Sequence, residues 1–210
     1  MRLLVIGAAG RTGRHVVDSA LATGHVVTAF VRRPDALDSQ REGLTVVRGD
    51  VLDPASVTSA MKGQEAVASV VGVKGRGQTT VFSAGMANVL DAMAGHGVRR
   101  VVALSTAGLD PDVEMPLAQR LVSRYIVARI LRNLYQDQAR MEAALEASDT
   151  DWTIVRATLL TDRPAAGNYR VSVGGELTAP ERIGRADLAA YIVSCLAEPE
   201  TFREKVMISY

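Results

Sequence analysis

The sequence has little of several residue types, and each shortage excludes a class of protein. One cysteine in 210 residues cannot form an internal disulfide, and Cys195 lies in an apolar run typical of a core position rather than a nucleophile. His15, His25 and His96 are scattered, so no Cys/His spacing indicates a metal site. No apolar run reaches the ~18 residues of a membrane span.

The charges are nearly balanced. A formal net charge of +1 gives no global field that would recruit nucleic acid or an anionic membrane. The first predicted strand begins within the first three residues, which leaves no room for a targeting peptide. Together with the single cysteine, this favours a cytoplasmic protein that binds neither nucleic acid nor membrane.

Short β-branched runs alternate with longer helical patterns, which predicts an α/β fold of the Rossmann type. We expect one domain over residues 1–210, with a doubly wound, mostly parallel sheet of about seven to eight strands and helices on both faces. Strands are predicted at 3–6, 26–31, 44–47, 66–71, 98–104, 153–155 and 169–173, and an edge strand at 206–208. Helices are predicted at 11–22, 54–61, 83–94, 117–147 (with a break near Asn133) and 187–197.

A glycine motif joins the first strand to the first helix. Gly7, Gly10 and Gly13 follow a Gly-x-x-Gly-x-x-Gly spacing, with Arg11 and Thr12 inside the loop. In such a loop the first glycine allows a tight turn, the second admits a pyrophosphate, and the third lets the helix approach the sheet. The free N–H groups of the helix then face the anion. A purely structural turn is the alternative interpretation.

The residues that close the second strand indicate which dinucleotide binds. An NAD site usually has an acidic residue here for the ribose 2′-hydroxyl, whereas this chain has Arg32 and Arg33. Guanidinium groups suit a 2′-phosphate, and Arg11 could reach it from the other side. NADP(H) is therefore the predicted cofactor, and a solvated basic patch is the alternative.

After the third strand, Asp50 and Val51 stand where this fold borders the adenine. A carboxylate there can accept from the exocyclic amine, and a valine can cover the ring. Asp53, which precedes Pro54, is instead predicted to cap the following helix.

The chain resembles the atypical short-chain dehydrogenase/reductase group, in particular the NADPH-dependent flavin reductases of the biliverdin reductase B type and the nitrogen-metabolite-regulator-like proteins. The resemblance covers nearly the whole chain. Its marks are Gly7–Gly13, Val31-Arg32, Gly49-Asp50-Val51, Val70-Val71-Gly72, Val101–Ala107, Asp151–Arg156 and Gly167–Val171. It implies further cofactor contacts at Val71, Gly72 and Thr158, and it places Thr106 at the family's active-site serine and Ser105 at the neighbouring threonine.

Two departures from the family narrow the chemistry. The Tyr-x-x-x-Lys pair of many short-chain dehydrogenases is missing, because no lysine lies three or four residues after a tyrosine. Tyr135 stands near the expected place, with Gln138 where relatives often carry lysine. Biliverdin reductase B has a histidine where this chain has Thr158. A threonine hydroxyl is a poor proton donor, so tetrapyrrole reduction is not favoured.

Without a positioned acid, alcohol–ketone interconversion loses about a hundredfold or more in rate. A flavin or quinone can accept hydride without such an acid. We therefore expect an NADPH-dependent reductase of a flavin, quinone or other conjugated acceptor, acting as a monomer or homodimer, with Ser105 and Thr106 as the catalytic hydroxyls. Those hydroxyls could instead satisfy loop backbone. The alternative functions are an NADP(H)-binding redox sensor without turnover, and a ketoreductase or isomerase with unusual acid groups.

The stretch from Leu117 to Leu134 carries four arginines and no acidic residue. Three interpretations stay open for it: a lid over the acceptor site, a self-association surface, or a core-packed helix with a solvated basic face.

Overall fold

A computed structural model describes residues 1–73, 79–107 and 128–210, and for 128–131 the backbone alone. The α-helices are α1 (Arg11–Ala22), α2 (Pro54–Met61), α3 (Val81–His96), α5 (Ala128–Glu146) and α6 (Arg185–Ser194). The strands are β1 (Arg2–Ile6), β2 (Val26–Val31), β3 (Leu44–Arg48), β4 (Ala66–Ser69), β5 (Arg100–Thr106), β6 (Asp151–Ala157), β7 (Leu159–Thr161), β8 (Arg170–Val173), β9 (Arg182–Gly184) and β10 (Glu204–Ser209).

Eight strands form the central sheet in the order β3-β2-β1-β4-β5-β6-β10-β8, and β8 alone runs antiparallel, against β10. The chain leaves β1 toward β2 on one side and returns to β4 on the other, so the topological switch point lies between β1 and β4. Ligands of open α/β sheets bind outside the carboxyl ends of the strands at such a point. The predicted Rossmann-type fold is confirmed.

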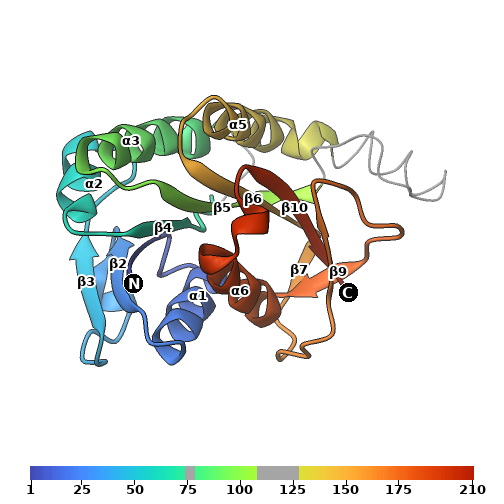
Figure 1. The fold of residues 1–210 in the computed structure, drawn as a ribbon, viewed down its shortest axis with the longest axis horizontal. Helices are drawn as coiled ribbons and strands as arrows, with labels where there is room; N and C mark the ends of the chain where they lie inside the picture. The colour runs from blue at the N-terminus through green and yellow to red at the C-terminus, as the bar shows by residue number, and fades with distance from the viewer. Residues whose placement is uncertain (74–78, 108–127) are drawn as a thin grey trace.

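The two faces of the sheet are covered by separate helices (Figure 1). Helices α1 and α6 pack together on one face, over a core that includes Val5, Val102 and Ile192. Helices α2, α3 and α5 cover the other face, over a core that includes Met86 and Ile154. This three-layer arrangement explains why the strands read as almost uniformly apolar in sequence.

Several expectations about strands were wrong. The last strand is not at the edge, because β10 lies between β6 and β8. Its Val206, Met207 and Ile208 are buried on both faces, as an interior strand requires. The fourth strand ends at Ser69 rather than at Val71, and β7 and β9 pair as a small second sheet that the sequence pattern did not indicate.

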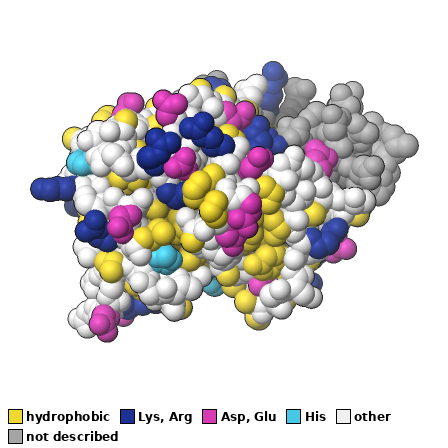
Figure 2. Space-filling model, in the orientation of Figure 1, with side chains coloured by type: hydrophobic (Ala, Val, Ile, Leu, Met, Phe, Trp, Pro, Cys, Tyr) yellow, Lys and Arg dark blue, Asp and Glu magenta, His cyan; other side chains and the backbone are white. Residues whose placement is uncertain are grey.

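The helix predicted at 117–147 is confirmed in its described part. Its described portion, α5, continues through Asn133 without the expected break. The rest of that prediction, and most of the basic stretch 117–134, lies outside the described residues. Across the described helices, none is long and apolar enough to cross a membrane. Charged side chains of both signs are interspersed on the face seen in Figure 2, in keeping with the balanced composition.

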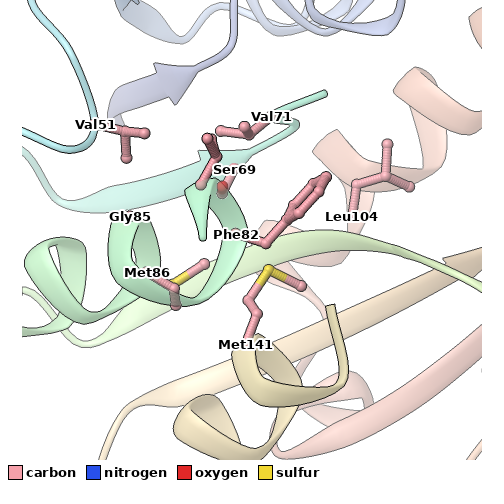
Figure 3. A pocket seen from close by; sticks show the side chains of 9 residues that line it. Val51, Ser69, Val71, Phe82, Gly85, Met86, Leu104 and Met141 are labelled. Carbon is pink, nitrogen blue, oxygen red and sulfur yellow. The ribbon is translucent and has the colours of Figure 1, made fainter. Parts of the chain in front are cut away.

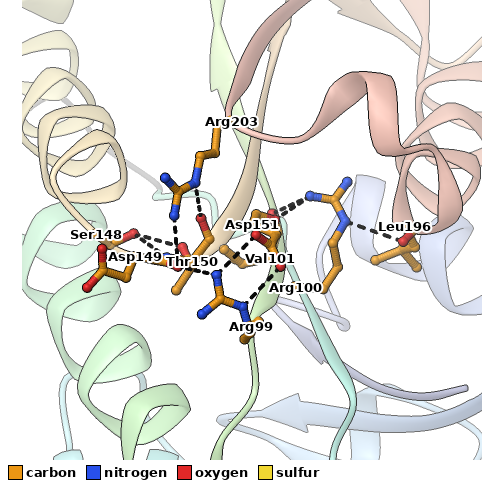
Figure 4. Close-up of polar contacts among 9 residues, drawn as sticks. All are labelled: Arg99, Arg100, Val101, Ser148, Asp149, Thr150, Asp151, Leu196 and Arg203. Atoms are coloured by element: carbon orange, nitrogen blue, oxygen red, sulfur yellow. Dashed lines mark hydrogen bonds and ion pairs between the residues drawn. The ribbon is translucent and has the colours of Figure 1, made fainter.

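A buried arginine fixes the amino ends of the central strands (Figure 4). The side chain of Arg100 is 7% exposed and donates to the carbonyl oxygens of Asp151 (2.5 Å), Cys195 (2.5 Å) and Leu196 (3.3 Å). Its guanidinium also stacks on the ring of Phe202 at 4.3 Å. Burial lowers the pKa of Arg100 to about 10. Arg100 therefore joins β5 to the end of α6 on the side opposite the carboxyl ends.

Candidate functional site

The residues predicted to bind cofactor or acceptor gather at one edge of the sheet. Each follows or ends a strand at its carboxyl end: β1 leads into the glycine loop, β2 into Arg32, β4 into Val71, β5 ends on Thr106, and β6 leads into Thr158. Because these strands are parallel neighbours, their carboxyl ends meet along one line. The topology brings the predicted site together.

The glycine loop has the shape of a cradle in which each glycine has a distinct job. Gly7 adopts a left-handed φ of +84°, and a Cβ there would lie 2.7 Å from the carbonyl oxygen of Val70. At Gly13 a Cβ would lie 2.1 Å from the Gly7 oxygen and 2.8 Å from Ala8 Cα, so helix and strand could not approach as they do. At Gly10 a Cβ would meet only the Gly7 oxygen, at 3.1 Å.

Gly10 is also the N-cap of α1. No described side chain caps this end of the helix, and its first turn holds no acidic residue. The amino end of α1 therefore presents backbone N–H groups and a positive dipole end to the loop. This is the donor arrangement that a pyrophosphate requires.

Arg11 lies beside the cradle but already has a partner. Its guanidinium pairs with the carboxylate of Asp162, which follows β7. The same carboxylate accepts from Arg185 Nη1 at 2.7 Å. Burial lowers the pKa of Arg185. Neither Asp162 nor Arg185 was expected here.

Arg32 and Arg33 are exposed and make no ion pair with any described residue. A third arginine joins them, because Arg48 ends β3 directly opposite Val31 of β2. The carboxyl ends of β2 and β3 thus carry three guanidinium groups. Such a cluster suits a phosphate better than a ribose hydroxyl.

The segment after β3 is held in place by two neighbouring helices. Asp53 caps α2 as predicted, accepting from the N–H of Ala55 at 3.2 Å. Asp50 Oδ1 accepts from the N–H of Leu52 at 3.0 Å, which fixes the carboxylate in a local turn. From α3, Asn88 Nδ2 donates to the Val51 carbonyl oxygen at 2.9 Å.

Val51 and Val71, which were predicted from different motifs, line the same small pocket (Figure 3). A Cβ on Gly85 would lie 2.9 Å from Val51 Cγ2, so this glycine lets α3 approach Val51. Apart from one serine the lining is apolar: Val51, Ser69, Val71, Val81, Phe82, Gly85, Met86, Leu104 and Met141.

Three polar atoms near the carboxyl ends of β5 and β6 are buried and find no partner among the described residues: Ser105 Oγ, Thr158 Oγ1 and Gln138 Oε1. Ser105 is 3% exposed and Gln138 is 7% exposed. Leaving such a group unsatisfied costs about 1–3 kcal/mol, so each of these atoms calls for a partner such as an ordered water, an ion or a bound ligand. These atoms fit a site that is completed by a bound polar molecule.

Tyr135 lacks the features of an activated acid. Burial raises its pKa above the ordinary tyrosine value, so this hydroxyl gives up its proton less readily than a free tyrosine does. Lysine would have the opposite effect, but Gln138 stands one turn further along α5. The neighbouring Asp137 is fully buried and accepts from Phe82 N (2.9 Å) and Ser83 N (3.3 Å), which caps α3 from α5.

A second buried carboxylate holds the segment that follows Asp162. Asp187 accepts from the N–H groups of Ala166 (2.9 Å) and Gly167 (3.0 Å) and from the hydroxyl of Tyr210 (2.6 Å). Burial opposes ionisation of this carboxyl, but the three hydrogen bonds outweigh it and lower its pKa. Asp187 therefore stays ionised at neutral pH and anchors the connection between β7 and β8.

Fold and site together define a dinucleotide-binding Rossmann domain. A family model for NAD(P)H-binding domains matches residues 7–199. The chain belongs to this NAD(P)H-binding family, as the resemblance implied, and the glycine cradle, the uncapped end of α1 and the arginine cluster fit such a dinucleotide.

The chain is also similar in sequence to proteins of other organisms. An uncharacterised protein of Mycobacterium tuberculosis is 32% identical over 85% of this chain. The chain spans only 22% of the length of that mycobacterial protein. A phenylcoumaran benzylic ether reductase of Pinus taeda is 22% identical over 99% of this chain and 68% of its own.

Two solved structures share the fold. A short-chain dehydrogenase/reductase from Veillonella parvula in complex with NADP is 20% identical, with a TM-score of 0.81 over 100% of this chain and 94% of its own. The anaerobilin reductase ChuY from Escherichia coli is 21% identical, with a TM-score of 0.79 over 100% of this chain and 97% of its own.

Proposed function

We propose that this protein is an NADPH-dependent oxidoreductase that transfers hydride to a flavin, quinone or other conjugated small molecule. The observation that carries the proposal is the buried hydroxyl of Ser105, which has no partner among the described residues and lies at the carboxyl end of β5. The reductase names of the Pinus and Escherichia relatives support the reaction class. We also propose that residues 1–210 act as one domain.

Each group at the site has a defined task in this proposal. NADPH, when bound, supplies the hydride. The glycine cradle and the end of α1 hold the pyrophosphate, and Arg32 and Arg33 hold the 2′-phosphate. Ser105 and Thr106 orient the nicotinamide carboxamide or the acceptor ring by hydrogen bonding. Asp50, Val51, Val71 and Gly72 border the nucleoside, and Thr158 completes the wall at β6.

The cofactor preference is testable by charge reversal. Arg32→Asp removes a charge-assisted phosphate contact of about 1.5–3 kcal/mol and should weaken NADPH binding about ten- to a hundredfold, with little effect on NADH. Arg41→Asp is the matched control, because Arg41 is also exposed and pairs with Asp18. Calorimetric titration of both nucleotides measures the change. An equal loss in the two variants would rule out a specific 2′-phosphate contact.

The mechanism predicts that no side chain is indispensable as a proton donor. Ser105→Ala and Thr106→Ala should each lower turnover about tenfold, the scale of one hydrogen bond of about 1.4 kcal/mol. Tyr135→Phe should keep most of the activity, because burial raises rather than lowers the pKa of this hydroxyl. Steady-state NADPH oxidation with riboflavin and with menadione measures all three variants. A thousandfold loss in Tyr135→Phe would instead identify a committed acid.

A further inference from the structure

A half-exposed carboxylate, whose side chain is 55% exposed, links the first residues of two helices. Asp162 pairs with Arg11, the first residue of α1, and with Arg185, the first residue of α6. Helices α1 and α6 pack side by side on one face of the sheet (Figure 1). Two guanidinium groups, one from the first residue of each helix, thus share one carboxylate.

The two arginines differ in how far their side chains are exposed to solvent. The side chain of Arg185 is 12% exposed, so it depends on Asp162 for its compensating charge. The side chain of Arg11 is 68% exposed, and an ion pair in that environment contributes little and exchanges readily. Arg11 can therefore leave Asp162 while Arg185 stays.

Arg11 directly follows Gly10, the residue around which the phosphate cradle is built. A phosphate in that cradle and the Asp162 carboxylate are then alternative partners for the same guanidinium. We infer that Asp162 sets the affinity of the cradle by competing with a cofactor phosphate for Arg11. This inference rests on the proposed dinucleotide function and names a residue that tunes it.

A double-mutant cycle tests the competition. Asp162→Asn removes the charge but keeps an acceptor oxygen for Arg185, and it should lower the Kd for NADPH about two- to fivefold, the scale of an exposed ion pair. Arg11→Met should raise that Kd. In the Arg11→Met background, Asp162→Asn should change the Kd by less than about twofold, because the competed group is gone.

Two controls separate competition from general effects. Asp18→Asn removes a carboxylate further along α1, which pairs with Arg41 from the segment before β3, and it should leave the Kd unchanged. Asp162→Ser, with the same expected direction, covers the case in which the asparagine variant does not fold, and thermal melts report folding. Titration with NADH shows which phosphate is involved: a gain for both nucleotides indicates the pyrophosphate, and a gain for NADPH alone indicates the 2′-phosphate.

The outcomes are distinct. An unchanged or raised Kd in a folded Asp162 variant would overturn the competition while leaving the proposed function standing, and so would an equal gain in the Arg11→Met background. A wild-type protein that binds neither nucleotide would overturn both.

Discussion

Gly10→Val is expected to abolish NADPH binding while leaving the protein folded. The Gly10 backbone has φ −69° and ψ 168°, an extended conformation that valine adopts readily. Its Cβ would meet only the Gly7 oxygen, at 3.1 Å, so the structure can absorb the change. The side chain would, however, fill the space in which a pyrophosphate must approach the backbone. Losing two charge-assisted hydrogen bonds of about 1.5 kcal/mol each corresponds to about a hundredfold or more in Kd.

Gly13→Val is the matched control, because the same side chain at the other glycine should damage the fold itself. Its Cβ would lie 2.1 Å from the Gly7 oxygen and against the Ala8 backbone, which cannot move without separating α1 from β1. We expect a loss of about 3 kcal/mol or more in the free energy of unfolding. Circular dichroism and the cofactor-induced melting shift, measured on both variants, separate the two effects. A full melting shift in Gly10→Val would contradict the cradle.

The second large effect is on stability, at the other end of the sheet. Arg100→Met should lower the free energy of unfolding by about 3–5 kcal/mol, because it leaves buried carbonyl oxygens of Asp151, Cys195 and Leu196 without their donor. NADPH affinity of the folded protein should not change, since Arg100 begins β5 and the predicted site lies where β5 ends.

Arg99→Met provides the comparison for Arg100→Met. The side chain of Arg99 is 60% exposed and pairs with Asp151 at 3.3 Å, a contact expected to contribute less than about 1 kcal/mol. Urea denaturation of the two variants measures the difference. Similar losses in both variants would show that burial of the Arg100 guanidinium is not what fixes this end of the sheet.

The sequence predicted the fold class and which segments meet at the candidate site, but not the order of every strand in the sheet. In a parallel sheet every residue that follows a strand arrives at the same edge, so Gly7, Arg32 and Thr106 could be grouped from local pattern alone. The position of β10 needed more, because strand order depends on pairing between distant segments. A signal was present, however: Val206, Met207 and Ile208 form an unbroken apolar run, which is typical of an interior strand rather than an edge.

Contacts between distant residues could not be read from spacing. Asp137 caps a helix that begins 56 positions earlier in the chain, at Val81. Asp162 pairs with Arg11, which is also distant in the sequence. Both aspartates look like ordinary charged residues in sequence. Their roles follow only from contacts between distant segments, because α5 packs on α3 and the residue after β7 lies against the first residue of α1.

The central claim is that the protein passes hydride from NADPH to a conjugated acceptor. The most direct test is a single-turnover experiment, in which wild-type protein, stoichiometric NADPH and excess riboflavin or menadione are mixed without oxygen and the nicotinamide absorbance is followed. We expect the absorbance to fall at least about a hundredfold faster than without protein, with matching reduction of the acceptor. NADPH that binds, as shown by calorimetry, but is oxidised no faster than in buffer would contradict the claim and identify a redox sensor instead.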